Sequence, residues 1–461
     1  MQPMVVYDRT ASGVLHVISL LPGDVTPPAG EQSFYRGASA DGATVAFETQ
    51  AQTEPGPLYL RIDDDATQQF APAGAAFDGL STDGRYAFYD LGGDIFRYDA
   101  ATETTEEVVN TTISTVVNVA PSGEAVYFAS PSDLAEGRPN PNGALPQAGG
   151  ENLYVWNEGA ISFVATVTAG DVAGVPVSMS NFPYGGLGLW KMSFVLGAAI
   201  DPSRTNASGS AFLFESRARL TNYDSQDHAE IYRFDAEAST LTCVSCSPTE
   251  LSAESDASLL SLTPDLFSPI PTSPYSEVPN LSEDGSRALF QTADALVSAD
   301  TDGVQDVYEW EAQGVGSCGS AAGCIYLISS GASAKDNYLY GVSADGDDVF
   351  FTTTDRLIER DAEGTPSIYD ARVDGGFAEA TVEGCEGEGC RPSLSPTPPE
   401  AARVGGPSGN VRPHPCAKGK HKTRRKGKVV CVKKHHRTKH HKKHRHHKGH
   451  RSSSANGRSG R

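Results

Sequence analysis

The 461-residue sequence has no long apolar run. The best candidate, Gly185 to Ile200, contains Lys191 and several glycines, and it is too short and too interrupted to span a bilayer. Histidine is also scarce: only His16, His228 and His414 precede residue 416. Most of the chain therefore has too few histidines to favour a catalytic triad or a metal site built from imidazole.

Common catalytic motifs are missing as well. The sequence has no Gly-x-Ser-x-Gly, no His-Glu-x-x-His and no Gly-x-x-x-x-Gly-Lys-Ser/Thr. Long helical patterns are scarce, whereas Gly (47) and Pro (29) are frequent and favour many turns. We therefore expect an all-β protein, and no reaction is indicated by a motif.

A short pattern recurs along the chain: Ser-x-Asp-Gly, about four residues, Phe, and then a strand centred on an aromatic residue. Complete copies begin at Ser39, Ser81, Ser282 and Ser343, and degenerate copies contain Ser122-Gly123 and Ser208-Gly209. Asp-Gly supplies the positive φ of a tight hairpin turn. Because each unit buries its apolar face only against the next, the repeat predicts a β-propeller.

Each unit is expected to contain four short antiparallel strands, since apolar and polar residues alternate. The predicted second strands are 44–48, 86–89, 125–129, 211–215, 287–291 and 348–352, and the third strands centre on Tyr59, Phe96, Tyr154, Tyr232, Tyr308 and Tyr369.

Residues 5–8 and 15–18 are typical of a third and a fourth strand. We expect about seven blades, the first incomplete in this chain. We also expect the natural product to begin upstream, with a leader and the two missing strands.

Three regions are predicted. Residues 1–378 form the propeller, 379–415 form a Cys-containing and then Pro/Gly/Ser-rich linker, and 416–461 form a disordered Lys/Arg/His-rich tail of low complexity. Within the propeller, 134–151, 169–199 and 248–277 are expected to be loops. Long loops on a rigid scaffold often carry function.

Charge is segregated between these regions. Residues 416–461 contain 18 Lys and Arg and no acid. The whole chain has 37 Lys and Arg, so residues 1–415 contain 19 of them against 58 Asp and Glu. The net charge of residues 1–415 is therefore −39. This asymmetry indicates a tail with its own partners, and the acidic body argues against nucleic acid as its ligand.

The units Ser-Ala-Asp-Gly-x-x-Val-x-Phe, followed by an Ile/Val-Tyr strand, resemble the WD40-like (TolB-type, PD40) propeller repeat over about residues 5–377. The segment Leu-Thr-Cys-Val-Ser-Cys-Ser-Pro-Thr at 241–249 and the basic tail at 416–451 resemble uncharacterised exported proteins of high-GC actinobacteria. The resemblance implies an extracytoplasmic propeller. It does not indicate a ligand or an activity.

Eight cysteines form four local pairs: Cys243/Cys246, Cys318/Cys324, Cys385/Cys390 and Cys416/Cys431. The even number and close spacing predict disulfides, and hence an extracellular or cell-envelope location. The pairing is inferred, because eight cysteines allow about 105 connectivities.

The loops before the third strands share Leu-x-x-x-Asp, and the fullest copy is Asp-Thr-Asp-Gly-Val-Gln-Asp at 300–306. The carboxylates of Asp300, Asp302 and Asp306, with Gly303 to bend the loop, are suited to a hard cation with oxygen ligands. The alternative is an Asx-turn that caps the strand connection. We expect no cofactor unless calcium binds at this loop.

The tail contains clustered histidines, a composition suited to transition-metal binding: His435, His436, His440, His441, His446 and His447. Its Lys and Arg favour anionic polymers or lipid head groups. The tail has no aromatic residue to stack bases, so we expect no sequence-specific nucleic-acid binding.

These features predict an exported, non-enzymatic β-propeller binding scaffold. Its loops would bind an unidentified protein or glycan, and its tail would attach to anionic envelope polymers. Two alternatives stay open: a carboxylate-based hydrolase or lyase in a central pocket, and a metal-sequestering protein that acts through the His-rich tail.

Overall fold

The computed structural model describes residues 4–376 and 420–433, except for 11–12, 52–54, 112, 170, 172–202, 250, 260–277, 360, 362–364, 374 and 426–427. The chain divides into two compact units, Met1–Arg391 and Pro392–Arg461, with the boundary inside the linker predicted over 379–415. Among the described residues, no helix is long and apolar enough to cross a membrane.

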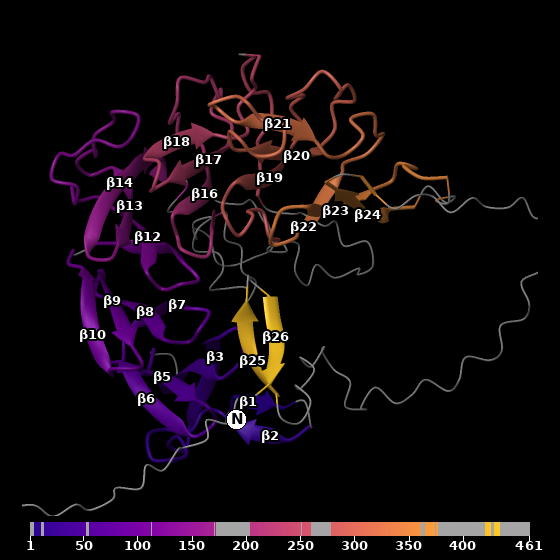
Figure 1. Cartoon of the computed structure of the whole chain (residues 1–461). Helices are drawn as coiled ribbons and strands as arrows, with labels where there is room; N and C mark the ends of the chain where they lie inside the picture. Colours follow the sequence, from indigo (N-terminus) through magenta and orange to yellow (C-terminus); the bar gives the residue numbers. More distant parts are fainter. Residues whose placement is uncertain are drawn as a thin grey trace, which may run out of the picture. The chain divides into compact units, whose positions relative to one another are not determined.

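Seven antiparallel sheets follow one another in the described part of the first unit, and Figure 1 shows them in chain order. The first sheet pairs β1 (Tyr7–Arg9) with β2 (Leu15–Val17). Four sheets of four strands follow. The first two contain β3 (Glu31–Ala38), β4 (Thr44–Ala51), β5 (Leu58–Ile62) and β6 (Ala66–Ala71), and then β7 (Ala76–Leu80), β8 (Tyr86–Leu91), β9 (Asp94–Asp99) and β10 (Thr104–Val109). The next two contain β11 (Thr115–Val119), β12 (Ala125–Ser130), β13 (Glu151–Asn157) and β14 (Ala160–Val167), and then β15 (Ser203–Thr205), β16 (Ala211–Ser216), β17 (Glu230–Asp235) and β18 (Thr240–Cys243). Two sheets of three strands complete the unit: β19 (Arg287–Thr292), β20 (Asp306–Glu311) and β21 (Cys324–Leu327); β22 (Tyr338–Val342), β23 (Asp348–Thr353) and β24 (Ser367–Arg372).

The repeat pattern located the strands closely. All six predicted second strands begin at the residue where β4, β8, β12, β16, β19 and β23 begin. In each of these sheets the aromatic residue of the third strand lies directly opposite an aromatic residue of the second. The ring centroids of these pairs are 5.1 to 6.0 Å apart, in Phe47–Tyr59, Tyr89–Phe96, Phe128–Tyr154, Phe214–Tyr232, Phe290–Tyr308 and Phe351–Tyr369. Such pairs contribute about 0.5–1.5 kcal/mol each beyond their buried area.

Ser-x-Asp-Gly encodes a self-contained turn. The Ser39 hydroxyl donates to Asp41 Oδ1 (2.8 Å) and accepts from Thr44 N (2.9 Å), and Asp41 Oδ1 also accepts from Ala43 N (3.0 Å). The same three bonds recur in the copies that begin at Ser81, Ser282 and Ser343. The motif satisfies the polar groups of its own turn, which supports an architectural role.

The turns also join neighbouring sheets. The residue after the serine donates its N–H to the carbonyl of the equivalent residue in the next sheet. These bonds measure 2.7 to 2.8 Å and join Ala40 to Thr82, Thr82 to Pro121, and Glu283 to Ala344. Because Pro121 has no N–H, the following residue, Ser122, donates to Ala207 O instead (2.9 Å).

The turn glycines contact the preceding sheet. A methyl group at Gly285, whose φ is +73°, would lie 2.4 Å from the Cβ of Ala211, the first residue of β16. Gly84, Gly123, Gly209 and Gly346 meet the preceding sheet in the same way, at Thr44, Tyr86, Ala125 and Arg287, which are the first residues of β4, β8, β12 and β19. Glycine at these positions therefore serves both the turn and the close approach of two sheets.

Six buried apolar clusters occupy the six interfaces between successive sheets, from Ile18 against the β3–β6 sheet to Phe351 against the β19–β21 sheet. Each cluster draws residues from two neighbouring sheets, so no sheet buries its apolar face alone. Antiparallel meanders that stack in this way, one interface after another in chain order, define the β-propeller fold that the repeat predicted.

Two sheets differ from the predicted four strands. In the β19–β21 sheet the expected first strand is reduced to a bridge between Leu281 and Ala288. Pro279 lies two residues before this bridge and has no N–H to donate to a ladder, which explains the reduction. The second difference is the three-stranded sheet β22–β24, whose expected fourth strand would fall after residue 376, outside the described residues.

The second unit has one described element, an antiparallel hairpin of β25 (Lys420–Arg425) and β26 (Lys428–Lys433). The hairpin was not predicted from the sequence, because the basic composition of the tail masks the short apolar segment at 429–432.

Candidate cation site before strand β20

The loop between β19 and β20 brings together the three carboxylates that the sequence singled out. One oxygen from each of Asp300, Asp302 and Asp306 lies within 4.8 Å of the other two. Gly303, with φ of +70°, bends the loop between them. Asp306 is the first residue of β20, so its position is fixed by the sheet.

Asp302 forms the Asx-turn that was the alternative to a cation site. Its Oδ1 accepts from Val304 N (3.0 Å), and its Oδ2 accepts from Ser333 N (2.6 Å) in the connection between β21 and β22. The turn and the acidic cluster are therefore both present. Asp302 also ties this loop to a second segment of the chain.

Asp300 and Asp306 each use one oxygen in a hydrogen bond within the sheet. The hydroxyl of Tyr308 donates to Asp300 Oδ2. Asp306 Oδ1 accepts from the hydroxyl of Ser329 and from Asn337 Nδ2, the latter at 2.8 Å. Neither Ser329 nor Asn337 was singled out from the sequence, because both lie more than 20 residues from the acidic loop and carry no local motif.

Three oxygens in this region are buried without a hydrogen-bond partner among the described residues: Asp300 Oδ1, Asp306 Oδ2 and Asn337 Oδ1. The side chains that carry them are 4%, 0% and 0% exposed. A buried polar atom without a partner costs about 1–3 kcal/mol, and more when it is charged. The arrangement thus leaves three acceptor oxygens whose burial is uncompensated within the described part of the chain.

The electrostatics of the cluster are unfavourable to three negative charges. Burial raises the pKa of Asp306 to about 6, with smaller contributions from the charges of Asp302 and Asp300. Burial also raises the pKa of Asp300. Among the described residues, no basic side chain forms an ion pair with any of the three carboxylates.

The neighbouring sheets repeat parts of this arrangement. Asp361 Oδ2 accepts from the hydroxyl of Tyr369 (2.5 Å), as Asp300 does from Tyr308. The hydroxyl of Ser245 donates to Glu230, as that of Ser329 does to Asp306. The aspartates of two Leu-x-x-x-Asp copies, Asp300 and Asp361, thus share a structural role in the tyrosine contact.

Two clefts flank the acidic loop. One, of about 450 Å³, is lined by Gly303 together with Tyr223, Ser247 and Glu254 from the preceding sheet's loops. The other, of about 420 Å³, is lined by Val304 with Tyr338 and residues 352–354. The loop is therefore the wall between two concave surfaces.

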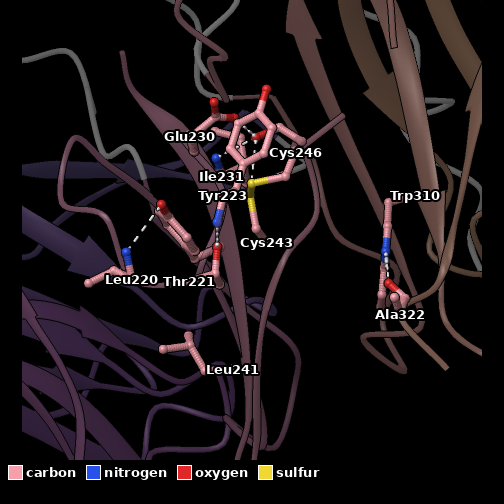
Figure 2. The surroundings of a disulfide bond; sticks show 12 residues. Leu220, Thr221, Tyr223, Glu230, Ile231, Leu241, Cys243, Cys246, Trp310 and Ala322 are labelled. Atoms are coloured by element: carbon pink, nitrogen blue, oxygen red, sulfur yellow. Dashed lines mark hydrogen bonds between the residues drawn. A yellow bond between two sulfur atoms is a disulfide. The ribbon is translucent and has the colours of Figure 1, made fainter. Parts of the chain in front are cut away.

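The structure contains two disulfides among the described residues, Cys243–Cys246 and Cys318–Cys324. Figure 2 shows the first beside Glu230 and Tyr223. Because these sulfurs are bonded to each other, they are not available as thiolate ligands, although they lie near Glu230. The remaining cysteines, Cys385, Cys390, Cys416 and Cys431, and the six tail histidines named above belong to pairs or clusters that lie outside the residues whose side chains the structure describes.

Two glutamates of the sheet β15–β18 have raised pKa values: the partly buried Glu215 in β16 and the buried Glu230 in β17. Burial raises the pKa of Glu215 to about 7, although Leu259 N and the hydroxyl of Ser258 donate to its Oε2. Burial raises the pKa of Glu230 to about 7 as well. Both groups therefore hold protons more tightly in the folded protein than their ordinary value of 4.5 would allow.

These shifts predict a stability that falls with rising pH. Between pH 4.5 and about 7 the folded state binds more protons than the unfolded state, so the free energy of unfolding decreases as the pH rises. Glu215→Gln keeps an acceptor oxygen and removes the charge. We expect the variant to exceed the wild type in unfolding free energy at pH 8 by about 1–3 kcal/mol and to match it below pH 4.5. Urea unfolding at both pH values measures this, and an equal difference at the two would contradict it.

Comparisons with known proteins give no family assignment. No family model matches the sequence. No curated protein matches it either. Solved structures similar to the chain include dipeptidyl peptidase 4 from Porphyromonas gingivalis (11% identity, TM-score 0.41, 81% of this chain and 50% of that chain) and TolB from Acinetobacter baumannii (11%, 0.29, 70% and 62%). The β-propeller domain of the Trilobed protease from Pyrococcus furiosus is also similar (11%, 0.35, 80% and 86%).

This chain thus spans about half the length of the peptidase and less than two thirds of the TolB chain. At these TM-scores the assignment rests on the chain's own sheet order, strand register and six interfaces. By those criteria the chain is a β-propeller repeat protein.

Proposed function

We propose that the protein is an exported, non-enzymatic binding scaffold. The propeller loops bind a partner, and the basic tail attaches the molecule to anionic polymers of the cell envelope. The observation that carries the proposal is the separation of charge: 18 Lys and Arg without an acid in residues 416–461. Such a segment binds polyanions by releasing their counterions.

Two further observations support the proposal. The disulfides Cys243–Cys246 and Cys318–Cys324 are typical of proteins outside the reducing cytosol. The clefts beside Gly303 and Val304 are of ligand size and are built from loops on a rigid scaffold.

A pull-down from an envelope fraction tests the proposal, with the full chain and a chain that lacks residues 416–461 as baits. We expect anionic polymer on the full chain only, and a loop-bound protein or glycan on both. If both baits retain the anionic polymer equally, the role of the tail is wrong. If the full chain instead retains Zn²⁺ or Ni²⁺ and no polymer, the metal-sequestering alternative replaces the proposal.

A further inference from the structure

We propose that Asp300, Asp302, Asp306 and Asn337 form a Ca²⁺ site that joins the β19–β20 loop to the connection between β21 and β22. The acidic cluster alone would not justify this proposal. The independent observation is the set of buried oxygens without partners, Asp300 Oδ1, Asp306 Oδ2 and Asn337 Oδ1. Each belongs to a side chain that is at least nine-tenths buried.

The hydrogen bonds that these side chains form within the fold use other atoms of the same groups. The tyrosine contact uses Asp300 Oδ2 and the serine contact uses Asp306 Oδ1. Asn337 donates from Nδ2 both to Asp306 Oδ1 (2.8 Å) and to Gln305 O (3.3 Å), and its Oδ1 has no hydrogen-bond partner among the described residues. A cation held by these side chains would supply a partner for buried acceptors and reduce the repulsion among the carboxylates.

The neighbouring loops show which parts of the cluster are specific to this one. In the preceding sheet, Gln226 stands at the position equivalent to Asp302. In the following sheet, Ser367 stands at the position equivalent to Asp306. The tyrosine and serine contacts recur without the full set of acids, so the complete set is not needed to build the turn.

The chemistry of the donors selects calcium. All four side chains offer oxygen, one of them a neutral amide, and none offers nitrogen or sulfur in place of it. Oxygen ligands of mixed charge in an irregular loop suit Ca²⁺, whereas Mg²⁺ demands near-octahedral geometry and retains several waters. Transition metals favour imidazole and thiolate.

The site lies where it would order a binding surface. Thr301 N donates to Gly331 O (2.9 Å), Asn337 N donates to Gln305 O (2.8 Å), and Asp302 accepts from Ser333 N, so the two segments are already bonded side by side. An ion held between them would fix the wall that carries Gly303 toward one cleft and Val304 toward the other. Ca²⁺ would then control the shape of both clefts without entering either.

Calcium titration of the metal-free full chain tests the proposal directly. We expect one Ca²⁺ per chain at this site by calorimetry, and a higher melting temperature with Ca²⁺ than with chelator. Asp302→Asn removes a charged ligand and keeps Oδ1 as the acceptor for Val304 N in the Asx-turn, while its amide NH2 replaces the oxygen that accepts from Ser333 N. The substitution should weaken calcium binding at least about tenfold. The control is Asp361→Asn, which removes the charge from the equivalent tyrosine contact in the next sheet and should leave calcium affinity unchanged.

A second measurement needs no variant. Hydrogen exchange of the wild-type chain should show Ca²⁺-dependent protection in residues 300–306 and 329–337, and no change around residue 361. The absence of stoichiometric binding, or equal binding by Asp302→Asn and the wild type, would overturn the proposal. Protection that is unaffected by Ca²⁺ would also overturn it.

Discussion

A chain that lacks residues 416–461 is expected not to bind immobilised polyphosphate. The truncation removes every one of the 18 Lys and Arg of the tail and leaves a molecule of net charge −39, which a polyanion repels. For the full chain, six or more phosphate contacts predict an affinity that falls by about 10³-fold or more between about 50 and 200 mM salt. Retention measured across this salt range should therefore be steep for the full chain and absent for the truncated one.

A second variant separates the charge of the tail from its imidazoles. Replacing the six paired histidines, His435, His436, His440, His441, His446 and His447, with Gln removes the clustered metal ligands and retains all Lys and Arg. This variant should bind polyphosphate with the same salt dependence as the wild type. Loss of binding in the histidine variant, or salt-independent binding by the full chain, would contradict electrostatic attachment.

Phe212→Ala is expected to destabilise the protein by about 3–5 kcal/mol. Phe212 in β16 is fully buried, and its ring stacks on Tyr127 in β12 of the preceding sheet, with centroids 3.9 Å apart and an interplanar angle of 11°. Truncating the ring removes this contact and leaves a cavity between two sheets. Urea denaturation gives the change in unfolding free energy.

Tyr127→Phe serves as the control for that substitution. It retains the stacked ring and removes only the hydrogen bond from the Tyr127 hydroxyl to Gly209 O (2.7 Å). The expected loss is about 1–3 kcal/mol, since a buried carbonyl loses a donor. If Phe212→Ala cost no more than Tyr127→Phe, ring packing between sheets would not be a main source of stability.

The repeat allowed much of the fold to be predicted from local pattern. Ser-x-Asp-Gly marks a turn whose hydrogen bonds are made within five residues, so second strands could be placed to the residue at Thr44, Tyr86 and Arg287. Breaks in the local pattern were harder to predict. The bridge at Leu281 depends on how Pro279 limits pairing with another strand, which strand periodicity does not report.

The candidate site shows the same division between local and distant information. Asp300, Asp302 and Asp306 are close in sequence, and their spacing predicted that the carboxylates would meet. Asn337 and Ser329 reach Asp306 from the β21–β22 connection. Their contribution depends on the pairing of β20 with β21, so it could be recognised only once the sheet was formed.

The turn glycines from Gly84 onward also form the contact between successive sheets, whereas Gly42 does not. Gly285→Ala and Gly42→Ala can therefore be compared, because the two glycines have φ values of +73° and +74°. A methyl group at Gly285 meets Ala211 Cβ at 2.4 Å, whereas at Gly42 no described atom lies within 4 Å.

The backbone strain of alanine is equal at the two sites, about 1 kcal/mol, so any excess at Gly285 reports the contact between sheets. We predict that Gly285→Ala lowers the unfolding free energy by at least about 2 kcal/mol more than Gly42→Ala does. Equal losses in the two variants would contradict the claim that the repeats stack on one another in chain order.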